Sequence, residues 1–209
     1  MMMTNNDWYR YYAPRRVAGL TPEGVAQGCA EAARDLDVVL ARTGLRPGDR
    51  ILEVGCGHGV LVSLLLADLT AGSVVAVDRS PAMIAAATRR NRAAVEAGRV
   101  RLQAATVADA DLADGAFDVV VSFDVRAFWT PPSPEWDVVD RVLAPGGRVV
   151  VAFSLMAPDS LERIGAAVRR LAQDRGFEQA GVHQRGTGPI GSAALELRRG
   201  QAATRTSGS

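Results

Sequence analysis

Apolar and polar residues alternate along this chain in two different rhythms. Short runs that are apolar throughout predict buried strands at 51–54, 74–77, 100–104, 117–122 and 148–153. The stretches between them repeat apolar residues three or four positions apart and predict helices at 60–69, 81–97, 136–143 and 159–175. Strands that are apolar on both sides are typical of a parallel sheet with helices on both faces. The pattern therefore predicts a doubly wound α/β fold with right-handed crossovers.

The end of the folded region predicts a different kind of connection. Two further strands are expected at 180–185 and 193–198, and the segment between them is too short for a crossover helix. These strands should form an antiparallel hairpin, which completes a mostly parallel, seven-stranded sheet. We assign residues 45–199 to one catalytic domain and expect the Ala-, Thr-, Ser- and Gly-rich residues 200–209 to be a disordered tail.

Residues 1–44 are predicted to form a separate N-terminal part on the substrate side of that domain. Four aromatic residues lie close together there: Trp8, Tyr9, Tyr11 and Tyr12. A helix is expected to begin at Thr21, because a Thr cap followed by proline is a common helix start, and to end at Gly44. The aromatic group either folds over a ligand as a lid or stays disordered, and we favour the lid.

Composition narrows the class of protein and its partners. The chain is 48% hydrophobic and 22% charged with a net charge of +1, which is typical of a globular protein without general attraction to nucleic acid or anionic lipid. No signal peptide and no long apolar run is visible, so a cytoplasmic location without membrane contact is expected. Two cysteines and two histidines are too few and too scattered to predict a disulfide framework or a metal site.

The most informative stretch is ILEVGCGHG at residues 51–59. A strand runs into a glycine-rich turn, and a helix opens directly after it. Glycine lets the backbone turn tightly and lets a ligand approach the peptide groups, while the helix start directs free N–H groups toward the ligand. A tight turn without a ligand is the alternative interpretation of the same glycines.

Asp78 strengthens the ligand interpretation because it ends the second strand, 21 residues beyond Gly57. Neighbouring strand ends in a doubly wound sheet would place its carboxylate beside the glycine turn, where it can accept hydrogen bonds from ribose hydroxyls. Asp78 could instead cap the next helix, but Ser80 before Pro81 fills that role equally well. Glu53 would repel a pyrophosphate, yet it suits a ligand with an ammonium group and no phosphate, such as S-adenosylmethionine.

At this point the chain resembles the class I S-adenosylmethionine-dependent methyltransferases, in the branch that acts on small molecules. The resemblance covers about residues 45–198 and rests on four segments in order: ILEVGCGHG (51–59), VVAVDRSPAMIAAA (74–87), FDVVVSFD (117–124) and VLAPGGRVVVAF (142–153). It implies a Rossmann-like fold, S-adenosyl-L-methionine as cofactor and in-line transfer of its methyl group.

The resemblance also implies roles for the residues at the first two strand ends. The glycine turn would lie under the methionine and ribose parts of the cofactor through Gly55, Gly57 and Gly59. Glu53 would lie near the methionine ammonium group, or would serve mainly to bind backbone amides of the turn. Asp78 would bind the ribose hydroxyls.

Further positions would surround the adenine and the reacting methyl. Arg79 or Met83 would lie along the adenine, and Thr106 and Val107 would contact its edge. Many relatives have Asp at the position of Thr106, so backbone amides would take over that contact here. Phe123 would face the methyl group from the end of the fourth strand.

Asp124 and His58 are the two candidates for a catalytic base, should the acceptor need one. Asp124 follows the fourth strand and would face the methyl group. His58 lies within the glycine turn, where packing or a hydrogen bond near the cofactor carboxylate is the competing interpretation. Phe128 and Trp129 either stack on the acceptor or close the core beneath the loop.

Missing features define the substrate class. The Asn/Asp-Pro-Pro-aromatic motif of nucleic-acid amine methyltransferases does not follow the fourth strand, and no Pro-Cys occurs. A small-molecule acceptor of a quinone-like, phenolic or secondary-metabolite kind is therefore predicted, for a monomer or homodimer that binds no nucleic acid. Two alternatives remain: a non-catalytic S-adenosylmethionine-binding partner or regulator, and an NAD-dependent oxidoreductase, which the glycine pattern disfavours.

Overall fold

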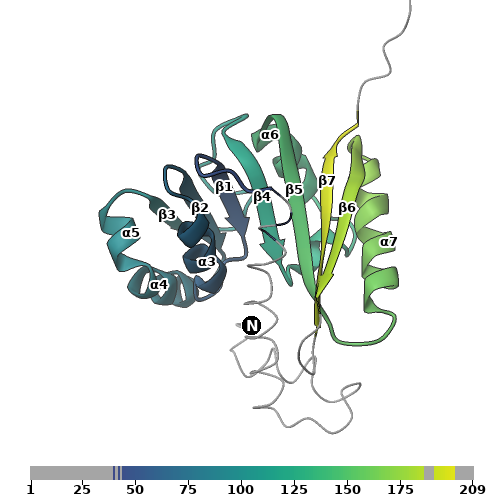
Figure 1. Ribbon diagram of the computed structural model, residues 1–209, viewed down its shortest axis with the longest axis horizontal. Coiled ribbons are helices and arrows are strands. Elements are labelled where there is room, and N and C mark those ends of the chain that lie inside the picture. Colours follow the sequence, from purple (N-terminus) through teal and green to yellow (C-terminus); the bar gives the residue numbers. More distant parts are fainter. Residues whose placement is uncertain (1–39, 41, 43, 186–190, 201–209) are drawn as a thin grey trace, which may run out of the picture.

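The computed structural model describes residues 40, 42, 44–185 and 191–200. In this part of the chain seven strands form one sheet with helices on both faces (Figure 1). The strands are β1 (Arg50–Val54), β2 (Ser73–Asp78), β3 (Val100–Ala104), β4 (Phe117–Phe123), β5 (Leu143–Leu155), β6 (Phe177–Arg185) and β7 (Gly191–Arg199). The helices are α3 (Val60–Asp68), α4 (Pro81–Arg90), α5 (Arg92–Glu96), the 3₁₀ helix η1 (Arg126–Phe128), α6 (Glu135–Val142) and α7 (Ser160–Gln173).

The strand order is β3-β2-β1-β4-β5-β7-β6. Neighbours among β1 to β5 are parallel, whereas β7 is antiparallel to both β5 and β6. Figure 1 shows the arrows of β1, β4 and β5 pointing the same way, so their carboxyl ends meet at one edge of the sheet. The predicted doubly wound fold and its antiparallel final hairpin are both confirmed.

The core consists of two apolar layers, one on each face of the sheet. Successive residues of a strand point to opposite faces, so Ile51 belongs to one layer and Leu52 to the other. The layer of Leu52 includes buried residues of α6 and α7, and the layer of Ile51 includes those of α3. Burial on both faces explains why the central strands are apolar throughout.

Three predicted boundaries were wrong. The helix expected at 81–97 is broken at Asn91, which ends α4 and precedes α5 with φ −106° and ψ 23°. The strand expected at 148–153 extends over Leu143–Leu155, because Leu143 pairs with Phe117 across a shift in register. The strand expected at 180–185 begins at Phe177, whose buried side chain joins the core.

The predicted N-terminal aromatic segment and helix lie outside the described residues, apart from the buried Leu40, and so do residues 201–209 of the predicted tail. Within the described residues, no helix combines the length and apolar character needed to cross a membrane. The division into residues 1–44, 45–199 and 200–209 stays a prediction.

Candidate cofactor-binding site

The glycine turn, residues 55–59, connects β1 to α3 at the carboxyl edge of the sheet. Its three glycines have φ values of +75°, +51° and +73°, a region that other residues rarely adopt. The N–H groups of Gly55 and Cys56 both donate to the carbonyl oxygen of Val77, at 2.8 and 3.1 Å. The turn is therefore fastened to the end of β2, as the predicted neighbourhood of the two strand ends required.

Gly57 differs from the other two glycines in what surrounds it. A Cβ atom added at Gly55 would lie 2.5 Å from a methyl carbon of Val125, and one added at Gly59 would lie 2.6 Å from the Asn91 amide nitrogen. A Cβ added at Gly57 would meet no atom of the described part of the chain within 4 Å. Two of the glycines thus allow close packing within the protein, and Gly57 leaves an open space above the turn.

Asp78 binds the turn directly. One carboxylate oxygen accepts a hydrogen bond from Gly57 N at 2.9 Å, and the other accepts one from Ser80 N at 2.9 Å. The competing capping role belongs to Ser80, whose hydroxyl accepts from Met83 N ahead of Pro81. Because each carboxylate oxygen can accept a second hydrogen bond, Asp78 keeps acceptor capacity for a pair of hydroxyls.

Glu53 lies two residues after Ile51 in β1, so both side chains point to the face of the sheet that α3 covers. Its residue surface is 2% exposed, and its Oε2 atom has no hydrogen-bond partner among the residues that the structure describes. Burial, and secondarily the negative charge of Asp78, raises the pKa of Glu53 well above its ordinary value. An unpartnered buried carboxyl oxygen fits a cationic ligand group such as an ammonium, directly or through water.

The positions predicted to hold an adenine follow β2 and β3. Ala105 N donates to the Asp78 carbonyl oxygen, which brings the loop after β3 beside the end of β2. Thr106 is exposed and its hydroxyl donates to Asp109 at 2.6 Å, while the side chain of Val107 is buried in the core. A contact by Val107 would therefore come from its backbone. Arg79 is exposed between β2 and α4, and Met83 is half-buried in the first turn of α4.

Asp124 follows β4 with a positive φ of 54°, an unusual conformation that tends to occur at functional sites. Its carboxylate is held by one residue at the end of β5: Ser154 donates its backbone N–H at 2.9 Å and its hydroxyl at 2.7 Å. Burial raises the pKa of Asp124, and the two bonds from Ser154 oppose that rise. Sequence reasoning missed Ser154, because a serine within an apolar strand carries no recognisable signal.

The other residues near the strand ends divide between site and core. His58 is half-buried in the turn, and its carbonyl oxygen accepts from Arg90 Nε at 3.0 Å. Phe128 is completely buried, edge-to-face with the Trp136 ring at 5.3 Å, so it closes the core. Trp129 is half-buried beside Phe153 and keeps surface for a ligand. Phe123 packs partly buried against the α3 layer.

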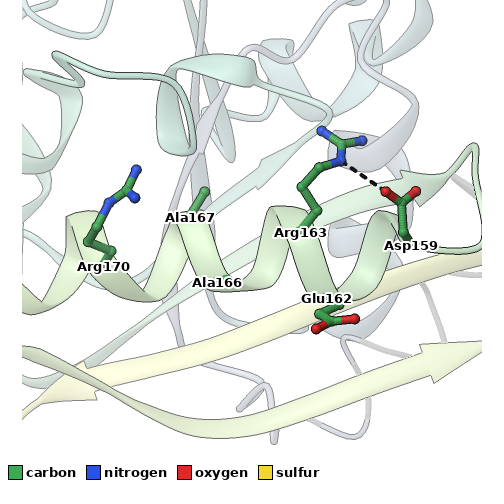
Figure 2. A pocket seen from close by; sticks show the side chains of 6 residues that line it. All are labelled: Asp159, Glu162, Arg163, Ala166, Ala167 and Arg170. Carbon is green, nitrogen blue, oxygen red and sulfur yellow. Dashed lines mark ion pairs between the residues drawn. The ribbon is translucent and has the colours of Figure 1, made fainter.

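A surface hollow lies elsewhere, along α7 (Figure 2). Its described lining comes from that one helix and is largely charged: Asp159, Glu162, Arg163, Ala166, Ala167 and Arg170. Arg163 and Asp159 form an ion pair at 3.5 Å. Because α7 packs against β5, β6 and β7, the hollow is separate from the glycine turn at the end of β1.

Comparison with known proteins shows what this arrangement is similar to. A sequence model of the methyltransferase domain matches residues 51–147. Demethylmenaquinone methyltransferase of Symbiobacterium thermophilum is 35% identical over 113 residues, 53% of this chain and 45% of that protein. The ubiquinone/menaquinone biosynthesis C-methyltransferase of Geotalea daltonii is 33% identical over 107 residues, 50% of this chain and 45% of that protein. The chain thus spans about half the length of these curated relatives.

A solved structure shows the same fold. Magnesium protoporphyrin IX methyltransferase from Synechocystis PCC 6803, with bound S-adenosylmethionine, has a TM-score of 0.65 and 22% identity and covers 92% of this chain and 89% of that chain. The matched domain begins with β1 and the glycine turn, where Asp78, Gly57 and Glu53 come together. Residues 51–147 therefore match a methyltransferase domain, and the fold is shared with a methyltransferase that binds S-adenosylmethionine.

Proposed function

We propose that this protein transfers the methyl group of S-adenosylmethionine to a small-molecule acceptor. The observation that carries the proposal is the edge formed by β1 and β2: open space at Gly57, spare acceptor capacity on Asp78 and an unpartnered oxygen on Glu53. Together these groups match a ligand that has ribose hydroxyls, an ammonium group and no phosphate.

The residues of the chain would act mainly by binding and orientation. S-adenosylmethionine supplies an activated methyl group, so the protein has to align an acceptor with it and exclude water. Glu53 would hold the ammonium group, Asp78 the ribose hydroxyls, and Phe123 would border the methyl group. Asp124 would accept a proton from the acceptor where one is released, because each of its carboxylate oxygens takes one hydrogen bond from Ser154 and can accept another.

A planar, largely apolar acceptor is the substrate class we favour. The quinone and porphyrin named for the relatives and for the solved structure are planar molecules. Trp129 provides a partly exposed ring next to the end of β4, and aromatic rings stack well on such surfaces. The chain's small net charge of +1 agrees with an acceptor that is not strongly ionic.

A second candidate is a protein that binds S-adenosylmethionine without transferring its methyl group. One observation favours it: Ser154 binds both carboxylate oxygens of Asp124, and these bonds oppose the rise of its pKa, which makes Asp124 a weaker base. Incubation with methyl-labelled S-adenosylmethionine and a panel of quinols, phenols, amines and acids separates the two. Label in any product supports the transferase, and label in none supports the binding protein.

The cofactor is tested first, by calorimetry with S-adenosylmethionine, S-adenosylhomocysteine and NAD. We expect micromolar binding of the first two ligands. Asp78→Ala should bind them at least about tenfold more weakly, because the hydrogen bonds that the carboxylate would accept from the ribose hydroxyls are lost. Asp78→Asn tests the charge with the shape retained. Asp114→Ala, which removes an exposed carboxylate paired with Arg141, is the matched control and should bind normally. Binding of NAD alone would contradict the proposal.

A further inference from the structure

We propose that Asn91, which is not part of the predicted site, is a positioning residue that sets the shape of the glycine turn for the cofactor. The proposal rests on the proposed function, because it concerns affinity for the same ligand. It starts from the break between α4 and α5, where Asn91 is 6% exposed and its side chain points back to the turn.

Every hydrogen-bonding group of the Asn91 side chain is used. Its amide nitrogen donates to the carbonyl oxygens of Gly59, at 3.0 Å, and Ala87, at 3.1 Å. Its amide oxygen accepts from the Ser63 hydroxyl at 2.8 Å, and Ser63 also approaches the Gly59 carbonyl oxygen at 3.1 Å. Asn91 therefore joins the glycine turn, α3 and α4 through one saturated amide group.

Three successive residues of the turn are held from a single segment of chain, 78–91. Asp78 accepts from Gly57 N at its beginning, Arg90 donates to His58 O near its end, and Asn91 donates to Gly59 O. Helix α4 runs between these contacts and keeps them at a fixed separation. The segment thus works as a clamp on the outer side of the turn.

The clamp determines where the first N–H group of α3 points. A trans peptide is planar and its C=O and N–H point in opposite directions. The Gly59 carbonyl oxygen accepts from Ser63 N at 3.2 Å, from the Ser63 hydroxyl and from Asn91, so the N–H of Val60 is directed away from these groups. Among the described residues, no side chain caps α3 and no acidic residue lies in its first turn, so its first N–H groups are available to an anionic ligand group.

The contacts also explain why Gly59 has no side chain. A Cβ there would lie 2.6 Å from the Asn91 amide nitrogen and 2.9 Å from Ala87 Cβ. The missing side chain of Gly59 therefore allows α4 to lie close to the turn and Asn91 to reach the Gly59 carbonyl oxygen. Loss of the Asn91 amide leaves the Gly59 carbonyl oxygen with its bonds from Ser63 alone and removes the link from the turn to α4, which frees the turn to adopt other shapes.

The test compares binding of S-adenosylhomocysteine by Asn91→Ala and Asn91→Asp with the wild-type protein. If the binding-competent shape of the turn falls to about a tenth of the population, the apparent Kd rises about tenfold. Thr88→Ala is the matched control, since it removes a side-chain bond inside α4, to Ile84 O, and should change the Kd less than about twofold. Backbone amide NMR signals of residues 57–60 should shift without ligand in the Asn91 variants alone.

The possible outcomes distinguish a failure of this inference from a failure of the proposed function. A wild-type protein that binds no S-adenosylhomocysteine defeats the proposed function itself. Normal binding and unchanged amide signals in a folded Asn91→Ala protein, even one with lower thermal stability, would overturn the positioning role. Should Asn91→Ala fail to fold, Ser63→Ala and Arg90→Ala weaken the same clamp from less buried positions; wild-type affinity in both would overturn it as well.

Discussion

A methyl group added at Gly57 meets open space, whereas one added at Gly59 meets two side chains of α4. We therefore expect Gly57→Ala to fold, with a loss of about 1–2 kcal/mol from the positive φ, and to bind S-adenosylhomocysteine at least about tenfold more weakly. Gly59→Ala should lose more stability, because packing atoms have to move as well. Urea unfolding and calorimetry on both variants measure the two effects.

Gly98 offers a matched control for that experiment. It also has a positive φ, +70°, and open space around it, but it lies between α5 and β3, outside the turn. Gly98→Ala should show the same backbone cost and normal binding. Equal binding by the Gly57 and Gly98 variants would mean that the space above Gly57 is not where the ligand lies.

Individual site residues differ in how well the sequence predicts them. Asp78 was predictable because strand ends in a parallel sheet are neighbours, and the bond to Gly57 N confirms that placement. Ser154 and Asn91 were missed for physical reasons. The Ser154 contact joins residues 30 apart, through the register of β4 and β5, and Asn91 interrupts a helix whose apolar repeat passes over it.

At the scale of elements, a buried ion pair fastens the turn before β1 to the sheet. Arg148 of β5 donates to Asp49 at 2.8 Å and to the Gly44 carbonyl at 3.0 Å, and both charged side chains are 5% exposed. Asp49 also accepts from Arg46 N within that turn. The pair holds together segments about a hundred residues apart in the sequence.

Removing one partner of this pair should be costly. Asp49→Ala leaves the Arg148 charge buried without its carboxylate, and we expect a loss of about 3–5 kcal/mol in the free energy of unfolding. The comparison is Asp111→Ala, whose pair with Arg101 is exposed at the surface and should matter by less than about 1 kcal/mol. Urea unfolding of both variants measures the two losses. Similar midpoints would mean that the Asp49–Arg148 pair contributes no more to stability than the exposed pair does.

Helices and strands were predictable where one periodicity runs without interruption. The exceptions contain local features that compete with it. Pro145, Gly146 and Gly147 are typical turn residues, yet β5 already pairs with β4 at Leu143, because a register shift accommodates them. Tertiary pairing prevailed there over local preference, which no single segment of sequence reveals.

For the molecule as a whole, the buried carboxyl of Glu53 in the site lowers the stability of the fold as pH rises. Because the folded state raises the pKa of Glu53, the folded protein retains this proton at pH values where the unfolded chain, near the ordinary 4.5, has lost it. Stability from this group is therefore present below pH 4.5 and is lost as pH rises toward the folded pKa, by up to about 1.4 kcal/mol per pH unit.

Glu53→Gln removes that dependence. Without ligand, the difference in stability between the variant and the wild-type protein should grow in favour of the variant as pH rises above the ordinary glutamate pKa of 4.5, while ligand affinity falls. Urea unfolding at several pH values measures it, with Glu96→Gln on the exposed side of α5 as the control. A constant difference across this range would mean that Glu53 does not retain its proton in the folded protein.

The position of β7 has a consequence for how the protein is made. The strand lies between β5 and β6, although it follows both in the chain. As a nascent chain leaves the ribosome, β6 and α7 emerge before the strand that joins them to the sheet, and the edge of β5 stays unpaired until Gly191–Arg199 has been synthesised. The sheet therefore closes by insertion of its last strand, and the exposed edge of β5 is the point at which a chaperone would protect an unfinished molecule.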